Sequence, residues 1–434
     1  MFALRGQEAG MLIEFYGQNF GCFRDEFRLS MLATDIDPDS DRGIVAVKVQ
    51  GDDEPLRLLR AAAIYGPNAS GKSTVLRAAG VLRSLIRGTG ALPSDSALQG
   101  YEPFGFSTEK TPVRLGITAV VDGAVYDYEV QFFEKHFSAE RLRLLHANEE
   151  PTELLDRHGQ DVSGKWTSDP QFSLISQSFR PNALLLSLAD RLAPALAKDI
   201  TVGLSRLLGT LRSYFPFGIG EIAAQRAHTD QNFADWLAGR LKSADFGVID
   251  MRPEEFEIRR PVFAGRGTKA AEFAEGFATE KAYRLSLVHG TSEQTFVVPY
   301  NLESGGTRRM IEIAPLFYDL AHAERPIAAF VDELHESLHP KLLEAVIREF
   351  NCDTPMNQVR GQLIFATHET ALLDGEAWTA LLRRDQIYLT EKDASGAARL
   401  YSVAEFKERN NLNIRRRYLQ GRYGALPSLG AFSD

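Results

Sequence analysis

Residues 66–73, with the sequence GPNASGKS, fit the pattern G-x-x-x-x-G-K-[ST] of a phosphate-binding loop. Such a loop surrounds phosphate groups with backbone N–H groups at the N-terminus of a helix. Lys72 is expected to reach the β- and γ-phosphates, and Ser73 is expected to ligate Mg²⁺. The nucleotide-binding residues predicted here are Gly66, Pro67, Asn68, Ala69, Ser70, Gly71, Lys72, Ser73 and Thr74.

The segments around the loop supply the structural context that the motif needs. Residues 58–65 form a short apolar run that predicts a buried strand, and residues 73–87 carry apolar side chains at helical spacing. A chance match in a glycine-rich turn would not be expected to have both. The order of strand, glycine loop and helix therefore favours a true phosphate site.

A second element with chemical potential ends in two acidic residues. The apolar strand predicted at 327–331 is followed by Asp332 and Glu333. At the end of such a strand Asp332 could hold Mg²⁺, directly or through water, and Glu333 could orient or deprotonate an attacking water. Strands that end in solvated acids are common in α/β proteins, so this motif gains its meaning from the phosphate loop upstream.

Two further segments follow the same logic. In the sequence LESGGT at 302–307, Ser304, Gly305 and Gly306 are expected to approach phosphate closely where a helix begins, and Ser304 also fits a helix cap. His368 comes just after the strand predicted at 363–366 and could hydrogen-bond the γ-phosphate, although a lone histidine is more often structural. The predicted catalytic residues are Glu333, His368 and Lys72, and the predicted metal ligands are Ser73 and Asp332.

Together these segments resemble ABC-type ATPases of the branch that includes SMC and RecF proteins. Within that branch the likeness is to AAA-type stand-alone ATPases of bacterial abortive-infection and related anti-phage systems. It is carried by MLIEFYGQNFGCFRDEFRLS at 11–30, VDELHESLHP at 331–340 and RRRYLQGRYGALPSL at 415–429. The resemblance covers most of the chain and is weakest over residues 150–285.

The resemblance implies ATP and Mg²⁺ as ligands and a head-to-tail homodimer, or a higher oligomer built on ATP-sandwiched dimers. Lys72, Ser73, Asp332, Glu333 and His368 would come from one subunit, and Ser304, Gly305 and Gly306 from the other. Residues 337–339 would lie at the subunit contact, and ATP hydrolysis would open the dimer.

Three functions are compatible with this reading. The first is a sensor ATPase in anti-phage defence that controls an effector partner such as a nuclease or toxin. No Toprim-like nuclease module follows the ATPase segments, so a partner protein would be expected to carry out any cleavage of nucleic acid. The second is a DNA-repair or recombination ATPase of the RecF or SMC type. The third is a transporter subunit, which the ESGGT signature and the long insertions disfavour. No Q-loop glutamine is assigned, with Gln131 and Gln177 as candidates, and no adenine-stacking aromatic is identified.

The predicted fold class is α/β: an ABC-type P-loop core of mixed or parallel sheet with helices, an antiparallel β-subdomain and a helical insertion. The β-subdomain is indicated by alternating runs around Asp122-Gly123, a hairpin signal. The predicted domains are an N-terminal ATPase lobe at 11–145, a mostly helical insertion or lid at 146–285, and a C-terminal ATPase lobe at 286–434.

Bulk properties limit the setting of the protein. The 434 residues contain no run of eighteen apolar residues and begin without a signal-peptide pattern, so no membrane partner is expected. Residues 1–10 are interpreted as an extension or loose tail. Two cysteines, Cys22 and Cys352, exclude a disulfide scaffold and favour the cytoplasm.

The net charge of −9 disfavours broad adhesion to nucleic acid, although a local basic groove could still bind DNA or RNA. Arg415, Arg416, Arg417 and Arg422, with Tyr418 and Tyr423, form one basic patch. It fits a DNA contact, a partner interface or a solvated C-terminal helix.

Overall fold

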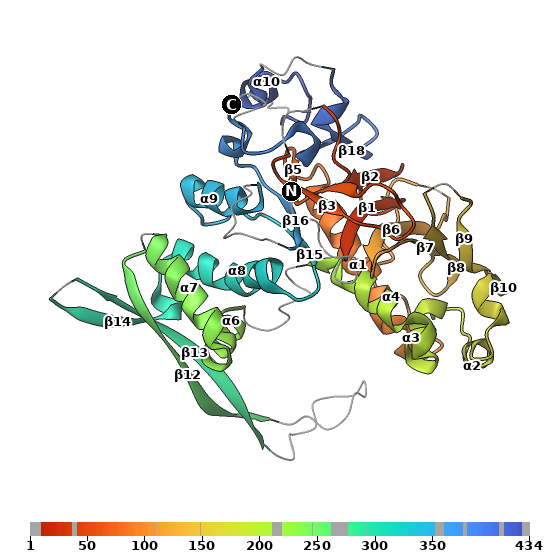
Figure 1. The fold of residues 1–434 in the computed structure, drawn as a ribbon, viewed down its shortest axis with the longest axis horizontal. Helices are drawn as coiled ribbons and strands as arrows, with labels where there is room; N and C mark the ends of the chain where they lie inside the picture. Colours follow the sequence, from red (N-terminus) through yellow and green to blue (C-terminus); the bar gives the residue numbers. More distant parts are fainter. Residues whose placement is uncertain are drawn as a thin grey trace. The chain divides into compact units, whose positions relative to one another are not determined.

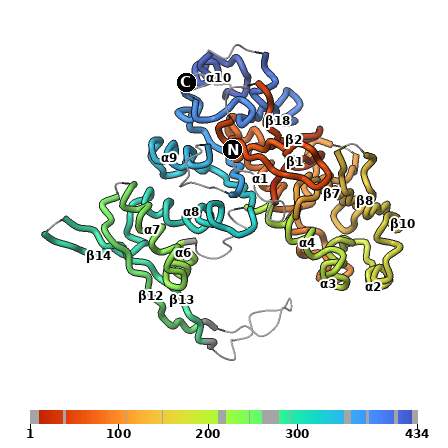
Figure 2. The backbone as a smooth tube through the Cα atoms, viewed as in Figure 1, coloured from red at the N-terminus to blue at the C-terminus, as the bar shows by residue number. Residues whose placement is uncertain are grey.

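The computed structural model describes residues 10–36, 41–107, 109–147, 149–210, 219–244, 246–261, 277–291, 293–351, 360–375, 380–407 and 412–427, which Figure 2 traces in colour. The chain forms two compact units. The first unit comprises Met1–Ser213, Asp319–His335 and Leu343–Asp434, and the second unit comprises Tyr214–Tyr318 and Glu336–Leu342.

A six-stranded sheet forms the centre of the first unit, with the strand order β11-β15-β16-β5-β17-β18 (Figure 1). Its strands are β11 Gly209–Thr210, β15 Ala328–Val331, β16 Gln362–Ala366, β5 Ala61–Tyr65, β17 Ile387–Lys392 and β18 Ala398–Ser402. All neighbours are parallel except β17 and β18. Every residue of β5, β15 and β16 is buried, as expected for parallel strands covered on both faces. The carboxyl ends of these three strands therefore meet at one edge.

A seven-stranded antiparallel sheet, β10-β9-β8-β7-β6-β1-β2, forms the second layer of this unit. Its strands are β1 Met11–Gln18, β2 Phe27–Ser30, β6 Val113–Val121, β7 Ala124–Phe132, β8 Phe137–Leu145, β9 Thr152–His158 and β10 Asp161–Ser163. Asp122 and Gly123 join β6 to β7 at φ 49° and 81°, which is the geometry of the predicted two-residue hairpin. A separate hairpin pairs β3 (Ile44–Val47) with β4 (Leu56–Leu59).

Helix α1 (Lys72–Gly88) lies in the core between these two sheets, because it contacts β15 and β16 of one and β6 of the other. Beside it, Phe15 of β1 meets Phe330 of β15 edge to face, with ring centroids 5.6 Å apart. The apolar face of α1 is thus covered on two sides. This packing fixes the first turn of the helix, where the phosphate loop ends.

One buried polar side chain also ties the sheets together. The Gln362 side chain accepts a hydrogen bond from the Leu12 backbone N–H at 2.7 Å, and donates to the carbonyl oxygens of Leu12 and Leu59 at 3.0 Å each. The register of β1 shifts between Leu12 and Glu14, so the amide serves backbone groups at an irregular point of the strand. Burying an amide that makes these hydrogen bonds costs little free energy. Removing the amide would leave buried backbone groups without hydrogen-bond partners.

Helices α2 (Phe172–Gln177), α3 (Leu185–Leu192) and α4 (Pro194–Arg206) also belong to the first unit. The fully buried Glu140 carboxylate of β8 accepts hydrogen bonds from the backbone N–H groups of Leu185 and Leu186, at 2.6 and 2.9 Å. A carboxylate is stabilising at a helix N-terminus because it faces unsatisfied N–H groups and the positive end of the helix dipole. Glu140 thereby docks α3 onto the seven-stranded sheet.

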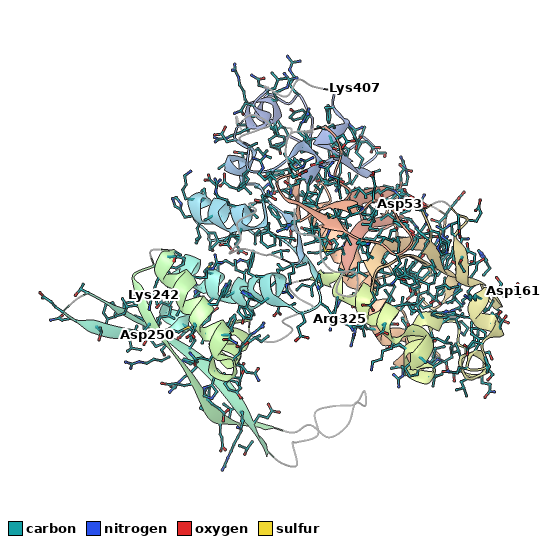
Figure 3. The ribbon with its side chains drawn as sticks, viewed as in Figure 1. Asp53, Asp161, Lys242, Asp250, Arg325 and Lys407 are labelled. Atoms are coloured by element: carbon teal, nitrogen blue, oxygen red, sulfur yellow. The ribbon has the colours of Figure 1, made fainter. Side chains whose placement is uncertain are left out.

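The second unit contains a long antiparallel hairpin, β12 (Val248–Pro261) and β13 (Phe277–Gly290), with β14 (Thr295–Pro299) paired to β13. Helix α6 (Ile219–Thr229) packs on β12 and β13, and α7 (Gln231–Ser243) contacts β12. Most of α8 (Gly305–His322) also belongs to this unit. Described side chains project from both sides of the hairpin (Figure 3).

The predicted fold class is confirmed, with a parallel sheet carrying the phosphate-loop strand, an antiparallel subdomain and inserted helices. The domain boundaries stay a prediction, and the compact units divide the chain differently. Within 146–285 the strands β9 to β13 accompany the helices. The predictions for residues 1–9 and for Cys352 lie outside the described residues. Over the described ranges, no helix has the length and apolar character needed to cross a membrane.

Candidate phosphate-binding site

The predicted phosphate loop connects β5 directly to α1, which begins at Lys72. Three of its residues have positive φ: Gly66 at 150°, Ala69 at 61° and Gly71 at 118°. A Cβ atom at Gly66 would overlap the Thr390 carbonyl oxygen, and one at Gly71 would lie 2.9 Å from the Phe23 ring. The two glycines of the motif are therefore required both by backbone angle and by close neighbours.

The Lys72 ammonium group folds back over this loop. Its Nζ donates hydrogen bonds to the carbonyl oxygens of Gly66 and Pro67, at 2.8 and 2.9 Å. Burial lowers the pKa of Lys72, while the carboxylates of Asp332 and Glu333 act in the opposite direction. The positive charge thus lies within the loop and within electrostatic reach of both acids.

Strand β17 holds the loop from the other side. The hydroxyls of Ser70 and Thr390 are hydrogen-bonded to one another at 2.6 Å, and the Thr390 hydroxyl also donates to the Tyr65 carbonyl oxygen at 3.2 Å. Sequence reasoning did not assign β17 or Thr390. The run IYLT at 387–390 could have indicated a strand, but its partner could not be inferred from local sequence.

The two acids lie where they were predicted, immediately after β15, and both are exposed. Glu333 adopts a φ of 46°, which is uncommon for a residue with a side chain. The Leu334 N–H donates to the Ala366 carbonyl oxygen at 3.2 Å, which fixes the turn after the acids against the end of β16. Residues with uncommon backbone angles cluster at functional sites, so the φ of Glu333 is consistent with a functional role for this residue.

His368 follows the end of β16, the strand between β15 and β5. Its ring meets that of His335 nearly edge to face, with centroids 5.7 Å apart. The pKa of His368 is lowered by burial, by the Lys72 charge and by His335, and raised by Glu333 and Asp332. His335 was not singled out by sequence reasoning, because a histidine after an acidic pair carries no motif of its own.

The predicted signature segment, residues 304–307, belongs to the second unit. Ser304 caps α8, because its Oγ accepts a hydrogen bond from the Thr307 N–H at 3.1 Å, as predicted. A Cβ atom at Gly306 would lie 3.0 Å from the Ser337 carbonyl oxygen, and one at Gly305 would lie 3.5 Å from the Ser337 hydroxyl. The second unit therefore brings the segment after the acids close to the signature glycines.

A family model described as "AAA domain, putative AbiEii toxin, Type IV TA system" matches residues 61–374. The chain belongs to this family. The match runs from the first residue of β5 to Asp374, and so includes the phosphate loop, the signature, the acidic pair and the histidine. A search of curated proteins gave no significant match.

Two solved structures are similar to this AAA-domain protein over most of its length. The SMC head domain from Thermotoga maritima has 15% identity and a TM-score of 0.37, covering 90% of this chain and 98% of the other. An SMC head bound to the C-winged helix domain of ScpA has 11% identity and a TM-score of 0.38, covering 90% and 97%.

In this AAA-domain protein the structure brings together one set of predicted residues. Residues 66–74, Asp332, Glu333 and His368 lie at the carboxyl edge of the six-stranded sheet, whereas residues 304–306 lie in the other unit. Of the two Q-loop candidates, Gln131 donates to Glu129 at 3.1 Å within β7 and Gln177 ends α2 at the surface. These positions give no reason to assign either one.

The structure alters the interpretation of the predicted basic patch at residues 415–423. Tyr418 and Tyr423 are buried, with 7% and 3% of their surfaces exposed, and each packs against another aromatic ring. Tyr418 packs on Tyr65, and Tyr423 packs on Phe406. Neither ring is exposed for contact with nucleic acid, so only the arginines of the predicted patch lie where such a contact could form.

The lowered pKa of His368 makes a measurable prediction. In the free protein the NMR titration midpoint of His368 should lie below its ordinary value of 6.5, so the ring is mainly neutral at pH 7. The folded protein favours the neutral form of His368, so this histidine stabilises the fold at high pH. Its contribution to the free energy of unfolding is fully present above the unfolded-state pKa and is lost as the pH falls through the folded-state pKa. Lys72→Met should raise the midpoint, because a neighbouring positive charge is removed. A midpoint at or above 6.5 in the wild type, or a fall in the variant, would contradict the assigned cause.

Proposed function

We propose that this protein binds ATP with Mg²⁺ and hydrolyses it between two copies of the chain, and that this cycle controls an effector in anti-phage defence. The observation that carries the proposal is the gathering of Lys72, Asp332, Glu333 and His368 at one edge of the six-stranded sheet. Lysine, two carboxylates and histidine beside a phosphate loop suit phosphoryl transfer to water.

The donor set fits a magnesium nucleotide. Ser73 is exposed in the first turn of α1, and Asp332 is exposed at the end of β15, so both can offer hard oxygen ligands. Mg²⁺ is usually bound by one or two protein oxygens together with substrate phosphates and water, so these two residues would be enough.

In the proposed reaction, water attacks the γ-phosphorus in line with the bond to ADP. The new bond joins the water oxygen to phosphorus, the bond to the β,γ-bridging oxygen breaks, and Glu333 accepts the water proton. Lys72 stabilises charge on the phosphate oxygens. His368, mainly neutral at pH 7, can donate one hydrogen bond to the γ-phosphate and lose that partner when phosphate leaves.

The proposed dimer would complete each nucleotide site with residues from both copies. Ser304 and the two glycines after it present a capped helix N-terminus, which favours an anion. We place this signature on the γ-phosphate held by a second copy, so that each nucleotide is enclosed by two subunits. Hydrolysis would then release the subunits from one another.

The role in defence rests on the family description, which names an AbiEii toxin and a type IV toxin–antitoxin system. An ATP-dependent dimer could hold an effector protein, such as a nuclease or toxin, until infection changes the nucleotide cycle. The alternative of a DNA-repair ATPase loses one support, because Tyr418 and Tyr423 are core residues.

The test compares the wild-type gene, expressed with its neighbouring genes, and a Lys72→Ala variant. Wild-type cells should restrict phage plating, and the variant should lose restriction because the phosphate loop no longer binds ATP productively. The purified wild-type protein should hydrolyse ATP with or without DNA, and the variant should not. Turnover that requires DNA, with equal plating of phage on both strains, would instead support the repair ATPase.

A further inference from the structure

The two residues that flank His368 are both hydrogen-bonded to the end of β5. The Thr367 N–H donates to the Ile64 carbonyl oxygen at 3.1 Å, and the Tyr65 hydroxyl donates to the Glu369 carbonyl oxygen at 3.0 Å. Ile64 and Tyr65 are the last two residues before the phosphate loop. The backbone on each side of His368 is therefore attached to the strand that carries the loop.

The hydrogen bond from the Tyr65 hydroxyl to the Glu369 carbonyl oxygen is a side-chain contact and not part of the backbone pairing between strands. Parallel pairing between β16 and β5 ends at Ala366 and Ile64, with one further backbone bond from Thr367, so the Tyr65 hydroxyl adds a side-chain contact on the far side of His368. Tyr65 is completely buried, and burial raises the pKa of its phenol well above the ordinary value, so the hydroxyl keeps its proton for donation. A buried hydroxyl that lost this partner would be left without a hydrogen bond, which favours keeping the contact.

The segment after His368 is ordered by its own short-range bonds. The Glu369 N–H donates to the Thr367 hydroxyl at 3.0 Å, and the Ala371 N–H donates to the Glu369 carboxylate at 2.8 Å. These bonds make residues 367–371 a compact turn. A displacement of the Glu369 carbonyl would thus shift the whole turn, including the His368 ring.

We infer that Tyr65 is a positioning residue for His368: its hydroxyl sets the place of the histidine relative to the phosphate loop. The inference rests on the proposed function, in which His368 contacts the γ-phosphate. It goes further by naming the group that couples the loop to the histidine. Local motifs do not mark Tyr65, because its hydroxyl acts on a residue 304 positions away.

The C-terminal segment supports the same tyrosine. Tyr418, in α10 (Ile414–Leu419), packs edge-on against Tyr65 with ring centroids 6.0 Å apart, and donates to the Ala425 carbonyl oxygen at 3.1 Å. Asn413, which caps α10, also donates to Asp374 beyond the histidine turn at 2.9 Å. The stretch around 413–425 is thus a support of the histidine turn as well as a surface segment.

The test is Tyr65→Phe in the full-length protein, because it removes one oxygen and keeps the ring that packs on Tyr418. We expect ATP affinity within twofold of wild type and a kcat about tenfold lower, since small misplacement of a group at the reacting centre lowers the rate. The His368 ring signals in the NMR spectrum should also move. Tyr388→Phe is the matched control, because Tyr388 is another buried tyrosine of the same sheet and donates to the Ser30 carbonyl oxygen at 2.9 Å.

A double-mutant cycle with His368→Ala separates positioning from general stability. If Tyr65 acts through His368, Tyr65→Phe should cause no further loss of kcat in the His368→Ala background. Equal losses in both backgrounds, or unchanged kcat and unchanged His368 signals in Tyr65→Phe, would overturn the inference. If His368→Ala alone keeps wild-type turnover, the proposed role of the histidine fails, while shifted His368 signals would still report the structural coupling.

Discussion

A Glu333→Gln protein should bind ATP as tightly as wild type and hydrolyse it about 10²–10⁴-fold more slowly, the range expected when a general base is removed. Glutamine keeps the size of the side chain and loses the proton acceptor. Because ATP would persist, the variant should also accumulate as a dimer in the presence of ATP and Mg²⁺. Phosphate release and light scattering measure the two effects.

The exposed Glu54, in the turn before β4, provides a control of equal chemistry. Glu54→Gln removes the same charge and should leave turnover and the ATP-dependent dimer unchanged. Wild-type turnover in Glu333→Gln would remove Glu333 from its assigned role. A slow variant that stays monomeric with ATP would preserve the chemistry and contradict the proposal that bound ATP holds the dimer.

Ser304→Arg should abolish both ATP-dependent dimerisation and hydrolysis while each subunit still binds ATP. The substitution places a long cation where a small serine begins α8, and the loss of the cap alone should cost about 1 kcal/mol of stability. Asp230→Ala controls for that cost, because Asp230 caps α7 in the same unit through the Phe233 N–H. This control should dimerise normally.

Mixing two inactive variants tests whether the signature acts across subunits. A dimer of one Ser304→Arg chain and one Lys72→Ala chain would contain one intact site, made from the phosphate loop of the first and the signature of the second. Because neither variant should pair with itself through ATP, only mixed dimers should form, and an equal mixture should recover up to about half of wild-type activity, from one intact site in two. No recovery from two well-folded variants would contradict the composite site.

Short-range sequence patterns predicted much of the fold. The phosphate loop was predictable because its glycines, lysine and serine lie within eight residues, and because the strand before it and the helix after it had clear apolar patterns. The Asp122-Gly123 hairpin and the Ser304 cap were predictable for the same reason, since each depends on a few neighbouring residues. The two tyrosines of the predicted C-terminal patch are buried instead of lying at the surface. A basic and aromatic stretch does not show which of its side chains are buried, because burial depends on the tertiary structure.

The sequence by itself determined which residues could perform phosphoryl chemistry: Lys72, Ser73, Asp332, Glu333 and His368. Only the tertiary structure decided what surrounds them. Parallel pairing placed β16 between β15 and β5, so residues nearly 300 positions apart share one edge. The Thr390 contact to the loop and the Tyr65 bond to Glu369 join strands distant in the chain, and no local pattern specifies such partners. Side-chain chemistry is local, whereas its geometry depends on long-range packing.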